Sequence, residues 1–542
     1  MCGIYGIVST NIYQQIVKGL SQLQNRGYDS AGICVLNGSL NVIKSADPEP
    51  LHILAKGHLS GHIGMGHNRW ATHGGNTYEN THPHLSNDRS WAIVHNGIIE
   101  NYEELKTMLY GYTFYSQTDS EVICNLLQYN YKGNVYNAIQ KTIHMLRGSY
   151  ALIILTTYEE KMYCVKQQSP LLVGYDGDKV IVTSEKSGFC YDVKYIILKE
   201  NDICVIDRDM IMTNYTYPEY DHTAGKEAMH TYPHWTLKEI HEQPEAVLRI
   251  RQQRVDLDVD NIILLGCGTS YYAGQYGMHF FKQSRRYTVQ AFEGADFTEA
   301  DIPKGKTAYI FISQSGETID LYQCLKITRG TTIGIINVED SLLARELDHV
   351  MYCNAGKEVG VASIKSFTNQ VVCLALLAGF EVDLAQLSAD IQTTIDRAIP
   401  VCKKMASTPN LFLIGKGTDE VVSREGALKL KEISYIHAEG YSASSLKHGP
   451  FALLDEHMPV ILLELTPASM SNCYHEIKSR KSPIFYITNR ENDLADLVIP
   501  ENKMFASLLG VIPLQLLAYY ISVSKGINPD KPKNLAKVVT VL

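Results

Sequence analysis

The chain has 542 residues, of which 45% are hydrophobic and 20% charged, values ordinary for a soluble globular protein. That length is too great for one hydrophobic core and predicts roughly three or four domains. The net charge of -9, without a dense Lys/Arg cluster, argues against nucleic acid as a partner. The twelve cysteines show neither CxxC nor Cys/His metal spacing, so we expect no metal site and no disulfide framework. Reduced thiols fit a cytoplasmic protein.

Two features bear on membranes. No charged segment followed by an apolar one precedes the first strand-like run, so no signal peptide is expected. The longest apolar stretch, 505–523, contains Pro513 and Gln515. We interpret it as a buried amphipathic helix rather than a membrane span, and expect no membrane partner.

Residues 1–213 are rich in short β-like runs, and only the segments 12–24, 101–109 and 119–129 read as helical. This pattern predicts an α+β layered sandwich. Residues 214–236 have no period and many polar and turn residues, so we place a linker at 214–244.

A repeat follows the linker. N-I-I-L-L-G-C-G-T at 261–269 corresponds to N-L-F-L-I-G-K-G-T at 410–418, and the next apolar runs correspond as well (308–313 with 459–464, and 333–337 with 484–488). Apolar strands alternating with helices predict two doubly wound α/β domains, at 245–385 and 400–530, followed by a tail at 531–542. Ligands in such folds bind at the carboxyl ends of the strands.

The two copies differ after the second strand. The first copy continues into S-Q-S-G-E-T (313–318), whereas the second has E-L-T-P-A-S. Hydroxyl and amide groups that open a helix can bind a phosphate, although an isolated S-x-S is more often a helix cap. Its place directly after a buried strand favours the phosphate. The chain has no G-x-x-x-x-G-K-[ST], so ATP or GTP hydrolysis is not indicated.

Three further residue groups suggest sugar chemistry. Glu425, Lys429 and Glu432 share one face of a predicted helix, either as an exposed salt-bridge ladder or as part of a site. With His448, which precedes a Gly-Pro turn, a carboxylate and a lysine would suit an aldose–ketose isomerisation. Lys537 lies in the apolar tail, where it is either a surface lysine or a desolvated one able to form a Schiff base.

Cys2 is poorly placed to be a core cysteine. Removal of the initiator methionine would expose an α-amine that can act as general base for its thiol. Asn96 and Gly97, in H-N-G, offer oxyanion donors, Arg69 suits a carboxylate, and Asp119 could hold an ammonium group. Each motif alone could be a turn or a cap. Together they describe a clamp for an amino acid that is cleaved in its side chain.

These motifs, with R-G-Y-D-S-A-G (26–32), R-W-A-T-H-G (69–74), G-V-A-S-I-K-S-F-T (360–368) and N-L-A-K-V-V-T-V (534–541), resemble the glutamine–fructose-6-phosphate aminotransferases over the whole chain. The M-C-G-I start alone would also fit asparagine synthetase, glutamate synthase and phosphoribosylpyrophosphate amidotransferase. The later motifs separate the chain from these. The resemblance implies an N-terminal-nucleophile (Ntn) glutaminase domain at 1–213, followed by two sugar-isomerase (SIS) domains.

The resemblance also implies roles in the glutaminase half. Cys2 would attack the glutamine amide, with an oxyanion hole formed by Asn96 and Gly97. Trp70 would gate an internal ammonia channel. Glutamine would be held by Arg69, Thr72, His73 and Asp119.

In the isomerase half, Lys537 would form the Schiff base, and Glu432 would move the C1/C2 proton beside Lys429. His448 would open the sugar ring from a second subunit, which implies at least a homodimer. Positions matching the phosphate and sugar contacts are Thr269, Ser270, Ser313, Gln314, Ser315, Thr318, Val361 and Ser363. No metal or organic cofactor is implied. The product would be glucosamine 6-phosphate, at the start of amino-sugar synthesis.

The chain departs from the family pattern in places. It is shorter than usual, Ser444 and Ser445 lie where G-E is more common, W-T-L replaces the usual residues at 235–237, and Lys533 replaces an arginine. None of these changes removes a catalytic group. Two alternatives stay open: a related enzyme for another ketose phosphate, and a sugar-phosphate-binding regulator without catalysis. A regulator would not need Cys2 or Lys537.

Overall fold

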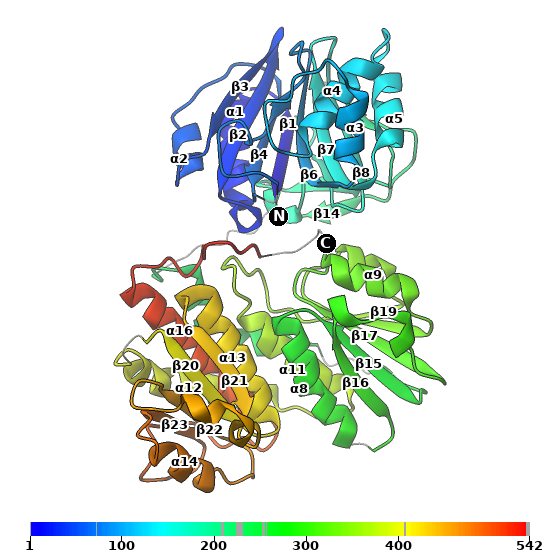
Figure 1. Cartoon of the computed structure of the whole chain (residues 1–542). Helices are drawn as coiled ribbons and strands as arrows, with labels where there is room; N and C mark the ends of the chain where they lie inside the picture. The colour runs from blue at the N-terminus through cyan, green and yellow to red at the C-terminus, as the bar shows by residue number, and fades with distance from the viewer. Residues whose placement is uncertain are drawn as a thin grey trace. The chain divides into compact units, whose positions relative to one another are not determined.

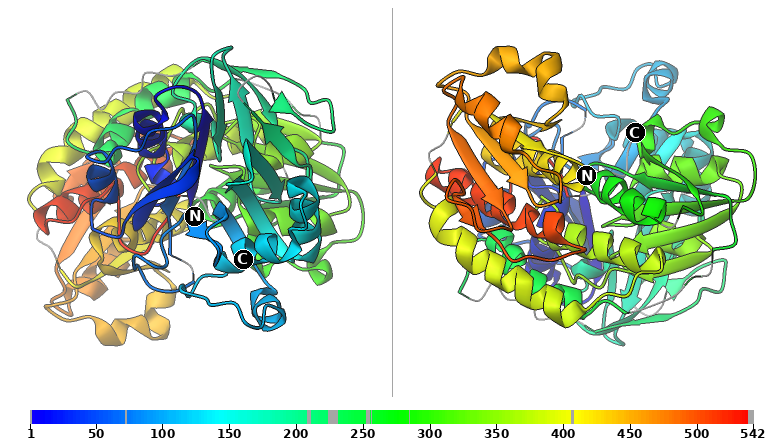
Figure 2. Two further views of the ribbon diagram at one scale, coloured as in Figure 1. Left: turned by 90° about the horizontal axis from the view of Figure 1, so that it is seen from above. Right: turned by 90° about the horizontal axis from the view of Figure 1, so that it is seen from below.

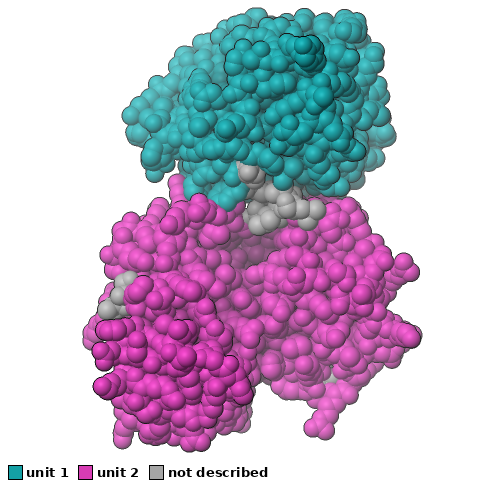
Figure 3. Space-filling view, in the orientation of Figure 1, with its two compact units in different colours: residues 1–227, 538–542 teal, residues 228–537 magenta. Residues whose placement is uncertain are grey.

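The computed structural model describes residues 2–71, 73–207, 211–223, 231–251, 255, 257–283, 285–405 and 408–537. They form two compact units, one within residues 1–227 and the other within 228–537 (Figure 3).

The first unit contains two antiparallel sheets (Figure 1). The larger has the order β14-β11-β9-β10-β1-β4-β2-β3, with β1 (Gly3–Val8), β2 (Ser30–Asn37), β3 (Ser39–Ser45), β4 (Ile63–Arg69), β9 (Leu172–Tyr175), β10 (Val180–Thr183), β11 (Val193–Ile197) and β14 (Tyr220–His222). The smaller has the order β13-β12-β8-β7-β6-β5, with β5 (His84–Leu85), β6 (Trp91–Ile99), β7 (Gly148–Thr156), β8 (Glu159–Gln167), β12 (Cys204–Ile206) and β13 (Ile211–Met212).

The sheets pack face to face on a core that includes Ile4, Met65, Val94 and Ile153. Helices α1 (Ile12–Gln22) and α2 (Pro50–Leu54) cover the outer face of the larger sheet. Helices α3 (Tyr102–Met108), α4 (Glu121–Asn130) and α5 (Val135–Met145) cover the smaller one. This helix–sheet–sheet–helix layering is the sandwich that the sequence predicts.

The second unit contains two parallel five-stranded sheets with the same strand order. The first, β16-β15-β17-β18-β19, is formed by β15 (Asn261–Gly266), β16 (Thr288–Glu293), β17 (Thr307–Ser313), β18 (Thr331–Ile336) and β19 (His349–Tyr352). The second, β21-β20-β22-β23-β24, is formed by β20 (Asn410–Gly415), β21 (His437–Ser442), β22 (Val460–Glu464), β23 (Ile484–Thr488) and β24 (Leu497–Val498). The strand order reverses between β15 and β17 in the first sheet and between β20 and β22 in the second. Doubly wound folds bind ligands at the carboxyl ends of the strands at such a point.

One continuous core joins the two halves of this unit, so the sheets face each other across a shared layer of helices (Figure 2, right). In chain order the helices are α6 (Trp235–His241), α7 (Gln243–Leu248), α8 (Thr269–Gln283), α9 (Ile319–Ile327), α10 (Leu342–Glu346), α11 (Lys365–Leu377), α12 (Leu384–Cys402), α13 (Thr418–Ser434), α14 (Ser471–Lys478), α15 (Ala506–Leu509) and α16 (Val511–Ser524). Helix α8 packs on both α11 and α13.

The structure differs from the sequence-based expectation in three places. The expected linker 214–244 contains strand β14, paired with β11, and helix α6. The interval between the two expected α/β domains is helix α12, which packs on both α7 and α16. The stretch 505–523 is buried as predicted, but it is not amphipathic, because α16 packs on α6, α12 and α13 around its circumference.

Ala506–Ser524 is the one helical stretch of the described residues that is long and apolar enough to span a membrane, and 89% of its apolar window is buried inside the protein. A core helix meets the same criterion, so this is weak evidence for a membrane segment.

Candidate active sites

Cys2 immediately precedes β1, and the pairing of β1 with β4 brings it beside the end of that strand. The backbone N–H of Trp70 donates to the Cys2 thiol sulfur at 3.3 Å, and the thiol lies 3.6 Å from the Trp70 carbonyl oxygen. The Cys2 carbonyl accepts hydrogen bonds from Asn96 Nδ2 (2.8 Å) and Arg26 Nε (3.1 Å). The strand register therefore fixes the thiol next to two of the predicted site residues.

Burial raises the pKa of the Cys2 thiol, although the hydrogen bond from Trp70 and the charges of Arg69 and Arg26 oppose this. The thiol is therefore protonated at neutral pH. A nucleophilic role requires a base that removes this proton as the sulfur attacks.

Asn96 and Gly97 lie near the end of β6, paired with β7. Gly97 has φ +138, and a Cβ there would lie 2.0 Å from the Ser149 carbonyl oxygen, so no other residue fits without distortion. Strand β6 continues through Gly97 to Ile99 beside β7, so this glycine allows the close pairing of the two strands next to Asn96, whose side chain reaches Cys2.

Arg69, at the end of β4, donates to the carbonyl oxygens of His73 (2.7 Å), Gly74 (3.2 Å) and Gly75 (3.0 Å). The guanidinium therefore shapes the loop that follows β4. Asp119 is buried and accepts a hydrogen bond from the Ile99 backbone N–H at 2.7 Å. In this structure Arg69 and Asp119, the two predicted clamp residues, also form hydrogen bonds with backbone groups.

The loop after β4 carries three more predicted residues. The Trp70 ring meets the Tyr28 ring edge-on, with centroids 6.2 Å apart. The His73 ring contacts Tyr102 in the same way at 5.7 Å. Thr72 lies outside the described residues.

The predicted phosphate loop follows β17 and ends at α9, where Thr318 is the N-cap. Ser313 Oγ accepts the Gly316 N–H at 2.9 Å and contacts Thr318 Oγ1 at 3.2 Å, while Ser315 Oγ accepts the Glu317 N–H at 3.1 Å. Gln314 is half-buried between the two serines. The loop thus gathers hydroxyl groups at a helix N-terminus, an arrangement suited to an anion.

Thr269 and Ser270 open α8, directly after β15. Since β15 and β17 are neighbouring parallel strands, their carboxyl ends bring these residues to the same sheet edge as the 313–318 loop. Ser270 Oγ is hydrogen bonded to Gln370 in α11. Five of the predicted contact residues therefore share this edge with Thr318.

Helix α13 places its predicted charged face against this edge. Lys429 Nζ donates to Thr269 Oγ1 at 2.9 Å and pairs with Glu432 at 2.5 Å and Glu425 at 3.4 Å. The side chains of Glu425 and Lys429 are 0% exposed, whereas that of Glu432 is 21% exposed. Of the three, Glu432 is the group that a bound molecule can reach.

The electrostatics of this face are uneven. Burial, with the nearby Glu432 charge, raises the pKa of Glu425 to about 8 against the attraction of Lys429, so Glu425 is protonated at neutral pH. Burial lowers the pKa of Lys429, but the two glutamates outweigh it and the net shift is upward. Lys429 is therefore a cation beside Glu432.

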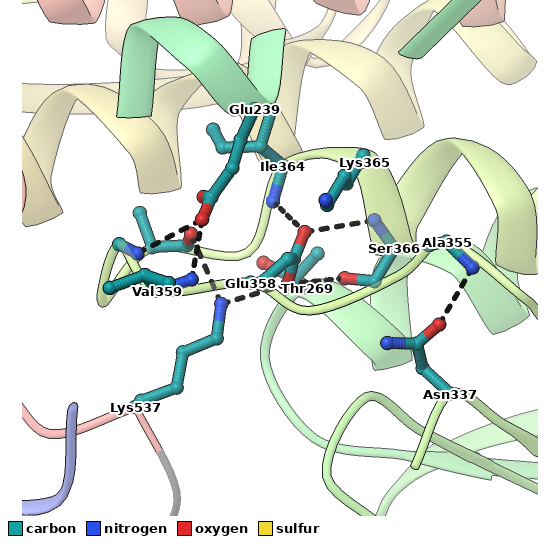
Figure 4. A network of polar contacts seen from close by, with 12 residues as sticks. Glu239, Thr269, Asn337, Ala355, Glu358, Val359, Ile364, Lys365, Ser366 and Lys537 are labelled. Atoms are coloured by element: carbon teal, nitrogen blue, oxygen red, sulfur yellow. Dashed lines mark hydrogen bonds and ion pairs between the residues drawn. The ribbon is translucent and has the colours of Figure 1, made fainter. Parts of the chain in front are cut away.

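Lys537 reaches the loop between β19 and α11 (Figure 4). Its Nζ lies 2.8 Å from Glu358 Oε2 and 3.4 Å from the Ala362 carbonyl oxygen, and its side chain is 1% exposed. Val361 and Ser363, the predicted sugar contacts, lie in the same loop on either side of Ala362. Lys537 is thus a buried lysine, not a surface one.

His448 is exposed on a short 3-10 helix, Ser445–His448, that follows β21. The structure does not bring it to the Lys537 pair or to the Glu432 pair within the described residues. Ser444 and Ser445 are also exposed there, and the neighbouring Lys447 pairs with Glu476.

Sequence reasoning missed two residues that contact predicted site groups. Arg26 is 1% exposed and donates to the Cys2 carbonyl, and it lies within the quoted R-G-Y-D-S-A-G segment. Glu358 pairs with Lys537 and lies two residues before the quoted G-V-A-S-I-K-S-F-T segment. A charged residue within or next to a family motif was the available signal in both cases.

The fold and these sites define a class: a glutamine amidotransferase domain joined to a pair of sugar-isomerase domains. The family model of the glutamine amidotransferase domain matches residues 67–190, and that of the SIS domain matches 257–379 and 404–524.

Relatives narrow the class. The chain is 41% identical to a probable glutamine–fructose-6-phosphate aminotransferase (isomerizing) of Acanthamoeba polyphaga mimivirus and 37% identical to the enzyme of that name from Clostridium acetobutylicum, in both cases over all of each chain. The solved C-terminal domain of the Francisella tularensis glucosamine-fructose-6-phosphate aminotransferase matches with a TM-score of 0.50 and 28% identity, over 57% of this chain and 100% of that one. This chain belongs to the glutamine–fructose-6-phosphate aminotransferase family.

Proposed function

We propose that this chain transfers the amide nitrogen of glutamine to fructose 6-phosphate and releases glutamate and glucosamine 6-phosphate. Hydrolysis of the amide consumes one water and yields ammonia, and amination of the sugar returns one water. Family membership and the presence of both domain types in one chain support this overall reaction.

In the glutaminase unit, the Cys2 sulfur attacks the glutamine amide while the α-amine exposed by loss of the initiator methionine takes its proton. The amine passes this proton to the amide nitrogen, which leaves as ammonia, and water then hydrolyses the resulting thioester to glutamate and the free thiol. Asn96 Nδ2 and the Gly97 N–H stabilise the oxyanion. Arg69 and Asp119 hold the carboxylate and ammonium groups of glutamine, together with Thr72 and His73. The raised pKa of Cys2 supports the need for a base.

In the isomerase unit, the 313–318 loop with Thr269 and Ser270 holds the phosphate, and Val361 and Ser363 contact the sugar. Lys537 forms an imine at C2 of the open-chain ketose with loss of water, ammonia then displaces the lysine from C2, and Glu432 moves a proton between C1 and C2. The Lys429 ammonium lies 2.5 Å from Glu432 and holds its carboxyl group in place for this transfer.

The proposal extends to partners and location. His448 of a second copy opens the sugar ring, so the enzyme is at least a homodimer; the exposure of His448 in the single chain supports this. Trp70 gates the passage of ammonia between the two reactions, which shields it from protonation. The reduced cysteines fit the cytoplasm.

The observation that carries the proposal is the buried Lys537, held by Glu358 in the loop of the sugar contacts. The test is an assay of glutamate and amino sugar from glutamine and fructose 6-phosphate, with Cys2→Ala as the matched variant. Cys2→Ala should lose glutamine hydrolysis yet still convert fructose 6-phosphate to glucose 6-phosphate. Normal glutamate release by this variant would show that the nucleophile is elsewhere.

Another ketose phosphate stays the alternative substrate, because the hydroxyl-rich loop recognises the phosphate more than the sugar. A parallel assay with tagatose 6-phosphate distinguishes the two. A kcat/KM for tagatose 6-phosphate that equals or exceeds the value for fructose 6-phosphate would contradict the proposed substrate.

A further inference from the structure

Glu358 is a buried carboxylate beside Lys537, and both of its oxygens accept hydrogen bonds (Figure 4). Its Oε1 accepts the backbone N–H groups of Ile364 and Ser366, both at 2.9 Å. Its Oε2 accepts the Ser366 hydroxyl at 3.0 Å and the Lys537 ammonium at 2.8 Å. The carboxylate is 0% exposed, so the same group fixes the loop and carries the charge that faces Lys537.

A second buried glutamate supports the same loop from α6. Glu239 Oε1 accepts the backbone N–H groups of Val359 and Gly360, and its Oε2 is buried without a hydrogen-bond partner among the described residues. Burial and the neighbouring Glu358 charge raise the pKa of Glu239 to about 8, although Lys537 and Lys365 oppose this, so it is protonated at neutral pH. Burial would also raise the pKa of Glu358, but Lys537 and the hydrogen bonds lower it to about 2. Only one of the two glutamates is an anion.

We propose that Glu358 is the counter-ion and proton carrier of Lys537, which it serves first as an ammonium group and then as a protonated imine. The inference rests on the proposed imine at Lys537 and deepens it. The geometric basis is the 2.8 Å contact between two fully buried, oppositely charged groups in the loop that carries Val361 and Ser363.

The proton movements balance. Lys537 Nζ gives one proton to Glu358, and its lone pair bonds to C2 of the ketose while the carbonyl π electrons move to oxygen. That oxygen takes a second proton from Nζ. It then leaves as water with the proton held by Glu358, and the nitrogen lone pair forms the C=N bond. Nζ is a cation at the start and at the end, and each time it faces the Glu358 carboxylate.

The charge on the imine also affects the sugar. A positively charged imine draws electrons from C1 and C2, which makes the proton on C1 easier to remove by a base such as Glu432. A fixed anion in a buried site holds that positive charge on the nitrogen without reorganisation. Glu358 would therefore support both imine formation and the later proton transfer.

The test compares Glu358→Gln with Glu239→Gln in the full-length enzyme. The amide oxygen that Glu358→Gln introduces can still accept the Ile364 and Ser366 N–H groups, so the change removes the charge and keeps the loop anchor. In the Glu239→Gln control, the amide replaces a carboxyl group that is already neutral, and its oxygen can still accept Val359 and Gly360. Three quantities are measured: glutamate release, amino-sugar formation from pH 5.5 to 9.5, and the adduct of Lys537 with fructose 6-phosphate trapped by cyanoborohydride.

We expect Glu358→Gln to lower amino-sugar formation by about 10²-fold and to shift the rising limb of its pH profile downward by roughly 1–3 pH units. The shift follows because loss of the anion destabilises the ammonium form of Lys537. Among the described residues, the other titratable groups around the pair are Lys365 on α11, Lys238 and Glu239 on α6, and Glu242 directly after α6. They are the same in wild type and variant. Glu239→Gln should stay within about threefold of wild type at pH 7, the range of ordinary context effects.

A pH profile that keeps its position in Glu358→Gln, whatever the rate, would overturn the proposal, because a structural role lowers the rate without moving the profile. If Glu358→Gln does not fold, Glu358→Asp keeps the charge and should keep the wild-type profile at a reduced rate; a shifted profile there would also overturn it. Failure of the proposed function is distinguishable, since the wild type would then form neither amino sugar nor a trapped Lys537 adduct.

Discussion

Cys2 and Lys537 are both reactive groups held by close polar contacts, but the contacts differ. The Cys2 thiol lies between the backbone N–H and C=O of Trp70, and burial keeps it protonated. Lys537 Nζ lies 2.8 Å from the Glu358 carboxylate. Each must therefore lose a proton before it can act as a nucleophile, and each has a base assigned: the α-amine for the thiol, and Glu358 for the lysine.

The lack of space around Gly97 predicts how a substitution there affects the glutaminase site. Gly97→Ala places a Cβ 2.0 Å from the Ser149 carbonyl oxygen at φ +138, so β6 and β7 must separate next to Asn96. We expect a loss of about 3 kcal/mol of stability, with glutamine hydrolysis nearly abolished. Thermal unfolding and glutamate release measure the two effects.

The matched control is Gly38→Ala in the β2–β3 turn, where φ is +64 and nothing lies within 4 Å of the added Cβ. It should cost about 1 kcal/mol and leave hydrolysis intact. Equal losses of stability and of glutamine hydrolysis in the two variants would mean that the close contact of Gly97 with Ser149 does not cause the effect.

The packing of helix α13 determines which of its three charged residues a ligand can reach. The i, i+4, i+7 spacing of Glu425, Lys429 and Glu432 predicts one face but not its surroundings. Because α13 packs on α8, the face is buried from Glu425 to Lys429 and opens at Glu432. The exposed-ladder alternative is wrong for the first two residues.

Glu425 makes the free energy of unfolding depend on pH. Glu425 has a pKa of about 8 when folded and an ordinary value of 4.5, so between these pH values the unfolded chain releases a proton that the folded chain keeps. The unfolded state therefore binds fewer protons, and the free energy of unfolding falls as pH rises through this window. Glu425→Gln should remove this fall and gain about 2–4 kcal/mol relative to wild type between pH 4.5 and 8.5.

Calorimetric unfolding of both proteins across this range measures the difference. Lys431→Gln, at an exposed position of the same helix, is the control and should leave the pH dependence parallel to wild type. A constant difference between Glu425→Gln and wild type would mean that Glu425 is already ionised in the folded protein.

Most elements could be predicted from the sequence because each buried strand of the second unit is a continuous apolar run in a repeated order. Strand β14 could not be, since its three residues carry no apolar pattern and form a strand only by pairing with β11. The same limit applies to the sites. Motifs located Cys2, Lys537 and the 313–318 loop, but the contacts of Cys2 with Trp70 and of Lys537 with Glu358 join residues 68 and 179 positions apart and depend on tertiary packing.

At the scale of the whole molecule, the proposed dimer makes each sugar site depend on two chains. Lys537→Ala and His448→Ala should each lose amino-sugar formation when purified alone. When the two are mixed and allowed to exchange subunits, a heterodimer has one site with both changes and one intact site, so about a quarter of wild-type activity should return. Native mass spectrometry of the mixture verifies that heterodimers have formed. No recovery in their presence would place His448 and Lys537 of the same chain in one site.

The two units carry separate chemistries, a thiol that releases ammonia and a lysine that binds a ketose, and in the proposed reaction one nitrogen atom links them. The most direct measurement supplies glutamine labelled with ¹⁵N in its side-chain amide, unlabelled ammonium in solution and fructose 6-phosphate, and determines the isotope in the product by mass spectrometry. We predict one ¹⁵N-glucosamine 6-phosphate for each glutamate released. Glutamate without amino sugar, or amino sugar that carries the unlabelled nitrogen of the solution, would contradict the proposed transfer.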